Sequence, residues 1–264
     1  MPASLWRPTP LLRASAGVHA LSLAGAVLFP AQWALAAGAV LASHVVLAAA
    51  GMWPRSRWLG PNLSRLPCGM RGVALTFDDG PDPEATPRVL DLLEGAGARA
   101  TFFCIGQRVE AHSGIAAAIV EGGHRLENHT LTHPNGFALL GPRRLAQEID
   151  RTQEILGELS GRPPRYFRAP AGIRSPWLEP FLARRGLTLT SWSRRGYDAV
   201  DPDADRVARR LIAGLAARDI LLLHDGSLLS RRPRTPVLEV LPCVLRRVKA
   251  AGLETLLLPG ESEA

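Results

Sequence analysis

The sequence predicts a parallel α/β fold, open or closed into a barrel, that follows an apolar N-terminal segment. From Arg71 onward, short apolar runs alternate with amphipathic stretches, a pattern typical of parallel sheets covered by helices. Between Arg13 and Arg55 the chain contains no Asp, Glu, Lys or Arg. The length of 264 residues is enough for one substantial domain and a modest appendage.

Apolar runs of strand length and longer amphipathic stretches give the expected elements of the main domain. The strands are expected at residues 73–77, 100–104, 124–128, 166–168, 188–192, 220–223 and 254–257. The helices are expected between them, at residues 86–94, 109–121, 142–159, 175–185, 205–217 and 236–250.

The uncharged N-terminal stretch has the length of two membrane spans, since one spanning helix needs about 20 apolar residues. Pro30 and Gln32 mark the expected turn, which gives transmembrane helices at about 11–29 and 31–53. Tryptophans lie near the expected ends, as interfacial aromatic residues do; they are Trp6, Trp33, Trp53 and Trp58. We therefore expect a membrane anchor over residues 1–65 and a catalytic domain over residues 66–264, with the lipid bilayer as a partner.

Two other interpretations of this segment remain open. Ala34-Leu35-Ala36 resembles a signal-peptidase site, although cleavage there would leave an apolar tail. The second interpretation is one membrane span followed by an interfacial helix.

The sidedness of the expected hairpin follows from its flanking charges. Arginines flank both outer ends of the hairpin and none lies between them. The positive-inside rule then places the catalytic domain on the cytoplasmic face of a bacterial-type inner membrane, or in the periplasm if the first segment does not span.

Charge and cysteine content argue against two other classes of protein. The formal net charge is +7, but residues 1–71 hold six arginines and no acidic residue, so the main domain is close to neutral. We therefore expect no nucleic-acid partner, because no basic patch interleaved with aromatic residues is present. Cys68, Cys104 and Cys243 are widely separated, which gives neither a disulfide framework nor a cysteine metal site.

Polar residues follow the expected strands at the points where those strands end. They are Asp78 and Asp79 after the first strand, His129 and His133 after the third, Arg168 after the fourth, Asp198 after the fifth and His224 after the sixth. Because the carboxyl ends of parallel strands line one face, where active sites form, these side chains are expected to converge.

His129 and His133 are four residues apart, so we expect them on one face of a helical turn that Pro134 ends. A surface or capping role is the alternative for such a pair. With Asp79 as a third ligand, a facial His-His-carboxylate set suits a catalytic divalent metal.

Three further residues have chemistry that suits hydrolysis beside such a metal. Asp78 adjoins Asp79 and could take a proton from water, although Asp-Gly-Pro is also ordinary turn chemistry. Arg168 could orient a carboxylate, and His224 could protonate a leaving amine. Taken alone, Arg168 would be a surface ion-pair residue and His224 a structural histidine.

This combination of motifs resembles the polysaccharide deacetylases with a NodB-homology domain, which include chitin, chito-oligosaccharide and peptidoglycan N-acetylglucosamine deacetylases. TFDDGP at 76–81, HTLTHP at 129–134, RAPAG at 168–172 and LLLHD at 221–225 match the family's motifs in order. The fourth family motif is often Asp-Trp, whereas here Asp198 is followed by Ala199. The resemblance covers roughly residues 71–258.

The resemblance implies a distorted (β/α) barrel of about seven strands. It also implies roles for individual residues: Asp78 as general base, Arg168 as its orienting partner, His224 as general acid and Asp198 as the residue that tunes His224. Asp79, His129 and His133 would bind the metal, most simply Zn²⁺, with Co, Ni, Mn or Mg as alternatives. Trp192, Tyr197 and Pro170 are expected to contact substrate.

The expected function is metal-dependent hydrolysis of the N-acetyl group of an amino sugar in a polysaccharide, oligosaccharide or lipid-linked glycan. The alternative is a catalytically inactive glycan-binding or scaffold protein of the same fold. Such proteins usually lose a metal ligand or the base, and all these groups are present here.

Overall fold

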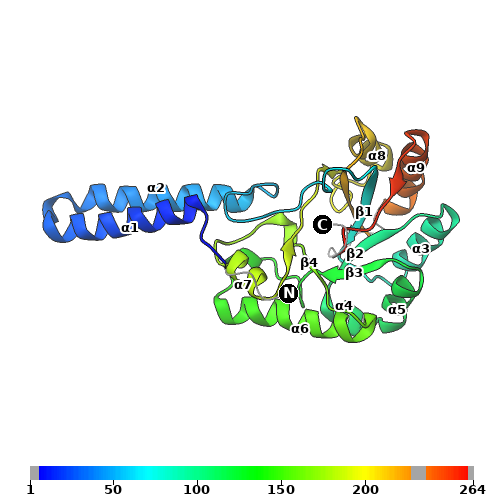
Figure 1. Ribbon diagram of the computed structural model, residues 1–264, viewed down its shortest axis with the longest axis horizontal. Coiled ribbons are helices and arrows are strands. Elements are labelled where there is room, and N and C mark those ends of the chain that lie inside the picture. Colours follow the sequence, from blue (N-terminus) through cyan, green and yellow to red (C-terminus); the bar gives the residue numbers. More distant parts are fainter. Residues whose placement is uncertain (1–5, 227–235, 261–264) are drawn as a thin grey trace.

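The protein consists of a parallel α/β domain from which a long helical hairpin projects (Figure 1). The structure is a computed structural model and describes residues 6–226 and 236–260. Its strands form one sheet in the order β5-β4-β3-β2-β1-β7-β6, and β8 pairs with β1. Every paired strand runs parallel to its neighbour. The predicted parallel α/β fold is confirmed.

The seven predicted strands are present, and one short strand was not predicted. The strands are β1 Gly72–Asp78, β2 Ala100–Cys104, β3 Arg125–Asn128, β4 Tyr166–Phe167, β5 Thr188–Leu189, β6 Arg194–Arg195, β7 Ile220–His224 and β8 Glu254–Thr255. The sequence of β6 is two arginines, so it has no apolar pattern from which a strand could be predicted.

The helices of the domain are α3 Ala85–Gly95, α4 Gly106–Ala111, α5 Ser113–Glu121, α6 Pro142–Ser160, α7 Leu178–Arg184, α8 Ala204–Ile212 and α9 Val237–Ala250. The single helix expected over 109–121 was wrong, because His112 leaves the helical region with φ −132° and separates α4 from α5. Ser113 and Gly114 follow it, and both residue types are weak helix formers.

Alternation along the central strands decides which side chains can reach the site. In β1, Val73, Leu75 and Phe77 pack against the outer helices, while Ala74 belongs to a separate cluster on the inner face of the sheet. Because side chains alternate in a strand, Asp78 points to the same face as Ala74. In β7, Leu222 belongs to that inner cluster, so His224 also points inward. The Cα atoms of Asp78 and His224 are register partners.

The segment between the hairpin and β1 crosses the inner side of the sheet. Leu63 pairs with Thr190, and Arg65 pairs with Asp219 immediately before β7. Leu66 is fully buried in the inner cluster with Ala74 and Leu222. Residues of this linker therefore pack as part of the domain, while the boundary at residue 65 stays a prediction.

Helices α1 Pro10–Leu28 and α2 Trp33–Met52 lie side by side, joined by η1 Pro30–Gln32 (Figure 1). Both are long and apolar enough to cross a membrane, and both are near the N-terminus. A polar seam joins them: Ser43 Oγ donates to Ser15 Oγ at 2.9 Å, and the rings of His19 and His44 lie 5.0 Å apart. The two helices agree with the predicted hairpin.

Candidate active site

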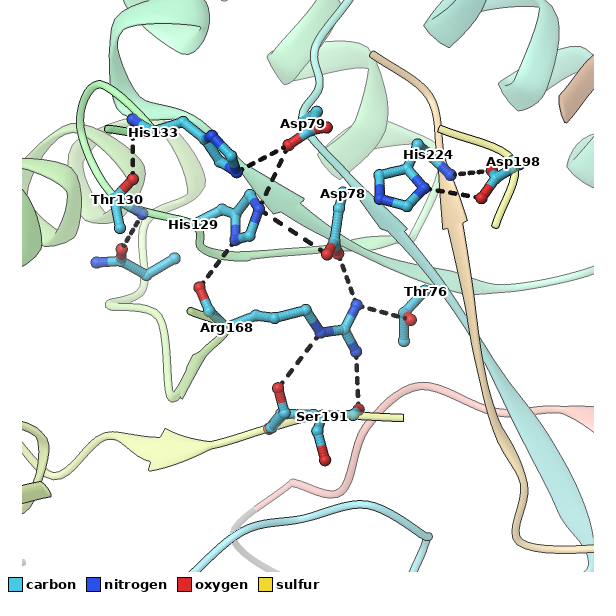
Figure 2. Close-up of polar contacts among 12 residues, drawn as sticks. Thr76, Asp78, Asp79, His129, Thr130, His133, Arg168, Ser191, Asp198 and His224 are labelled. Carbon is cyan, nitrogen blue, oxygen red and sulfur yellow. Dashed lines mark hydrogen bonds and ion pairs between the residues drawn. The ribbon is translucent and has the colours of Figure 1, made fainter. Parts of the chain in front are cut away.

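The seven polar residues predicted at the strand ends converge at the carboxyl edge of the sheet (Figure 2). Asp78 ends β1, and Asp79 follows it with a positive φ of 73°. His224 ends β7 beside Asp78. His129 and His133 follow β3, Arg168 follows β4, and Asp198 follows β6.

Three side chains form a group suited to a metal ion. Asp79 Oδ1 lies 3.4 Å from Nε2 of His129 and 3.4 Å from Nε2 of His133. The three ligand atoms are all within 4.8 Å of one another. Asp79 Oδ1 is buried and has no hydrogen-bond partner. A buried carboxylate oxygen between two imidazole nitrogens fits the donor set of Zn²⁺ and of other divalent transition metals.

A hydrogen bond at Nδ1, the ring nitrogen away from Asp79, fixes the orientation of His129. Its Nδ1 lies 2.8 Å from the carbonyl oxygen of Arg168, which can only accept, so Nδ1 must carry the proton. The lone pair of Nε2 then points toward Asp79. This is the arrangement by which metal-binding histidines are commonly oriented.

The expectation of a helical turn between the two histidines was wrong. Residues 129–133 form an irregular loop in which Thr130 and His133 have positive φ values of 70° and 49°. The backbone N–H of His133 donates to Thr130 Oγ1 at 3.0 Å. The rings still converge, with centroids 4.9 Å apart, because this turn folds the chain back.

Glu148 of α6 holds this loop and was not identified from the sequence. Its Oε2 accepts from the backbone N–H groups of Leu131 and Thr132 at 3.0 and 2.9 Å, and its Oε1 accepts from Thr132 Oγ1 at 2.7 Å. Asn128 Oδ1 accepts from Thr130 N–H at 2.9 Å. Glu148 is 3 % exposed, and a glutamate on the apolar face of a helix is the signal that could have found it.

The pKa values of the two histidines of the group are shifted in opposite directions. Burial lowers the pKa of His133 to about 4, assisted by the charge of His129. Burial also acts to lower the pKa of His129, but the charge of Asp78 and the contact with Asp79 outweigh it and raise this pKa. Burial alone would raise the pKa of Asp79, yet the neighbouring histidines lower it to about 2. The group therefore presents an ionised carboxylate, which would favour a cation.

Asp78 is held by a fully buried arginine. Arg168 Nη1 donates to Asp78 Oδ1 at 2.6 Å and to Thr76 Oγ1 at 2.9 Å. Its Nε and Nη2 donate to the carbonyl oxygens of Thr190 and Ser191 at 3.3 and 3.1 Å. The guanidinium carbon lies 4.0 Å from the ring centroid of Phe103. With Oδ1 engaged, Oδ2 of Asp78 remains on the side of the metal-suited group, 3.8 Å from His129 Nε2.

His224 forms a pair with Asp198 on the other side of Asp78 (Figure 2). His224 Nδ1 lies 2.8 Å from Asp198 Oδ1, and the backbone N–H of His224 donates to Oδ2 at 2.7 Å. Burial acts to lower the pKa of His224, but the charge and hydrogen bond of Asp198 outweigh it and raise the pKa to about 9. His224 can therefore hold a proton at neutral pH.

Asp225 lies behind the Asp78–Asp79 turn. It is fully buried and accepts from Thr86 Oγ1 at 2.6 Å, and burial raises its pKa to about 7. A Cβ on Gly80 would overlap the carboxylate of Asp225. Glycine at position 80 therefore allows the turn to pack directly on Asp225.

The residues expected to contact substrate have different environments. Trp192 is 6 % exposed and packs against Gly172 in the loop after β4, and Pro170 of that loop is buried. Tyr197 is 47 % exposed. Substrate contact by these three residues stays a prediction.

Known proteins share this fold and its motifs. A family profile described as polysaccharide deacetylase matches residues 67–189. A chitooligosaccharide deacetylase from Bradyrhizobium sp. (strain ANU 289) is 38 % identical over 162 residues, which cover 60 % of this chain and 72 % of that protein. The chain belongs to the polysaccharide deacetylase family.

Two solved structures extend the comparison to the fold. The Bc1960 peptidoglycan N-acetylglucosamine deacetylase superposes with a TM-score of 0.69 at 29 % identity, covering 75 % of this chain and 91 % of that one. A family 4 acetyl xylan esterase from Clostridium thermocellum, in complex with a cobalt ion, superposes with a TM-score of 0.63 at 32 % identity, covering 70 % and 87 %. These matches confirm the predicted barrel-type fold.

Removing the Glu148 carboxylate should loosen the loop that carries both histidines. We expect Glu148→Ala to weaken metal affinity by roughly 10- to 100-fold, as loss of an outer hydrogen-bond partner does at other metal sites. Competition with a chromophoric chelator measures this affinity. Glu154→Ala on the same helix is the control, because that side chain is 60 % exposed. Unchanged affinity in a folded Glu148→Ala variant would show that Glu148 does not support the site.

Asp198 should set the protonation of His224. We expect Asp198→Asn to lower the pKa of His224 from about 9, because burial is then opposed only by the smaller effects of the Asp79 and Asp78 charges. The proton on His224 would be lost at correspondingly lower pH. Histidine-selective NMR titration of the chelator-treated protein measures this shift. A pKa that stays near that of the parent protein would contradict the assignment.

Proposed function

We propose that the protein is a metal-dependent hydrolase that removes the N-acetyl group from an amino sugar of a glycan. The observation that carries the proposal is the Asp79–His129–His133 group with a separately held carboxylate, Asp78, and a protonatable histidine, His224, beside it. The activity of the chitooligosaccharide and peptidoglycan deacetylases to which the chain is similar supports the same reaction.

Asp79, His129 and His133 would hold the divalent ion, with Zn²⁺ the first candidate and Co, Ni, Mn or Mg as alternatives. The bound ion would polarise the acyl carbonyl and lower the pKa of a water molecule. The donor set of two imidazoles and one carboxylate leaves positions open for substrate. The buried, unpartnered Oδ1 of Asp79 supports this assignment.

Asp78 would act as the general base. Arg168 binds its Oδ1 at 2.6 Å, which fixes the carboxylate and leaves Oδ2 to accept the proton of the attacking water. Arg168 is a positioning residue in this scheme, because its donors are directed to protein atoms.

His224 would act as the general acid. Its Nδ1 is engaged by Asp198, so Nε2 can donate a proton to the nitrogen of the breaking C–N bond. An amine is a poor leaving group until it is protonated, and a pKa of about 9 keeps His224 protonated at neutral pH. Asp198 would then stabilise the charged imidazole and hold its ring.

We also propose that α1 and α2 anchor the protein as a transmembrane hairpin in a bacterial-type inner membrane. Arg7 and Arg13 precede the apolar stretch, Arg55 and Arg57 follow it, and no Lys or Arg lies between. The positive-inside rule then supports a cytoplasmic catalytic domain.

Replacing the base should abolish turnover. We expect Asp78→Asn to reduce acetate release from N-acetylated oligosaccharides by roughly 10²- to 10⁴-fold, because the amide cannot accept the proton. Asn keeps an oxygen for Arg168, so we expect the variant to fold and to bind metal, at lower stability because the buried guanidinium loses its charged partner. The measurement uses the full chain in detergent, with and without chelator and metal add-back, and Asp91→Asn on the surface of α3 as control. Near-parental activity of Asp78→Asn would remove Asp78 from the mechanism, and release from O-acetylated xylan alone would indicate an esterase.

The sidedness can be tested with topology reporters. A fusion of alkaline phosphatase after Ala264 should be inactive, since the enzyme needs the periplasm to form its disulfides. A fusion after Gln32, in the turn between the two helices, should be active. The opposite pattern would place the catalytic domain in the periplasm.

A further inference from the structure

The exposed apolar side chains of the catalytic domain lie on one edge. Among the described residues, the large apolar side chains that are exposed outside the hairpin and its base are Leu139, Ile173, Trp177, Tyr197 and Val200. All five lie in segments that follow the carboxyl ends of β3, β4 and β6. We call them the apolar rim. Leu139, in the segment that continues from the HTLTHP loop, is 90 % exposed.

The part of the apolar rim around Ile173 adjoins the base of the hairpin. The backbone N–H of Arg174, next to Ile173, donates to the carbonyl oxygen of Gly51 near the end of α2 at 3.1 Å. Trp53 and Trp58 follow α2 and are each 56 % exposed. Trp177 precedes α7, which lies near the base of the hairpin in Figure 1. Tryptophan and tyrosine at this position are typical of the membrane–water interface.

A cation lies beside the rim and has no ion-pair partner among the described residues. Arg195 is half-buried, its Nε has no hydrogen-bond partner, and it forms no ion pair among the described residues. Its guanidinium carbon lies 4.8 Å from the ring centroid of Tyr197 and 5.2 Å from that of Trp192. A guanidinium held between aromatic rings is suited to bind a phosphate.

We infer that the apolar rim rests on the bilayer and that the substrate is an N-acetylated amino sugar carried on a membrane lipid through a phosphate. This inference rests on the proposed function. The hairpin fixes the active-site edge at the membrane surface, the rim contacts the lipid, and Arg195 binds the phosphate between lipid and sugar. An apolar edge of this kind, next to a membrane-spanning hairpin, matches a headgroup that rises from the bilayer.

The test compares one headgroup in two physical forms. Full-length protein in phosphatidylcholine–phosphatidylglycerol nanodiscs is given N-acetylglucosaminyl-phosphoryl-polyprenol in the same bilayer. Water-soluble N-acetylglucosamine 1-phosphate and chitotetraose are given in parallel, and acetate release is measured. We expect kcat/KM for the lipid-linked sugar to exceed that for either soluble sugar by tenfold or more. A tenfold gain is about what one buried apolar group contributes to affinity.

Two variants separate the rim from the phosphate contact. Leu139→Ser combined with Trp177→Ser should raise KM for the lipid-linked sugar by about tenfold with little change in kcat, because lipid contact is lost. Ala251→Ser, an exposed position at the opposite end of the sheet, is the control. Arg195→Gln should raise KM for both phosphorylated sugars but not for chitotetraose, with Arg88→Gln as control.

If chitotetraose is turned over at least as efficiently as the lipid-linked sugar, this inference is overturned and the proposed function stays intact. An equal effect of the rim variants on all three substrates would overturn the inference in the same way. If no acetate is released from any of the three by the metal-loaded protein, the proposed N-deacetylation fails, and the inference fails with it.

Discussion

The buried guanidinium of Arg168 is the constraint on which the site depends. A fully buried charge is tolerated only when it is paired and hydrogen-bonded, and removal of one partner of such a pair typically costs about 3–5 kcal/mol. Arg168 meets this requirement through Asp78, Thr76 and two carbonyl oxygens from the segment after β5. Its own carbonyl oxygen accepts from His129. One residue thereby connects the proposed base to the proposed metal site and ties β1 to β4.

The two adjacent aspartates acquire different environments because the strand ends between them. Asp78 is the last residue of β1 and follows the alternation of the sheet toward Arg168. Asp79 adopts a positive φ and turns its carboxylate toward the two histidines. A base must accept a proton while a metal ligand must stay ionised, and this geometry gives each task to a separate carboxylate. A third aspartate, Asp198, binds His224 and so has an environment different from those of Asp78 and Asp79.

The sequence predicted much of the fold and of the site, because alternation and strand-end positions are local patterns that the sheet converts into proximity. It failed where tertiary contacts override local pattern. The loop from His129 to His133 has helical spacing, yet Glu148 and Asn128 hold it as an irregular turn. Strand β6 exists only because its backbone pairs with β7. Glu148 itself lies 15 residues beyond His133 in the sequence, and only the packing of α6 shows its role.

The most direct test of this account is a crystal structure of the protein soaked with Zn²⁺, with anomalous diffraction measured at the zinc edge. We expect one strong peak bonded to Asp79, His129 and His133, at about 2.0–2.2 Å from each ligand atom. We also expect Asp78 to remain hydrogen-bonded to Arg168 and outside the metal's coordination. An ion bridging Asp78 and Asp79 with Arg168 displaced, or an ion bound elsewhere while this group stays in place, would contradict this account.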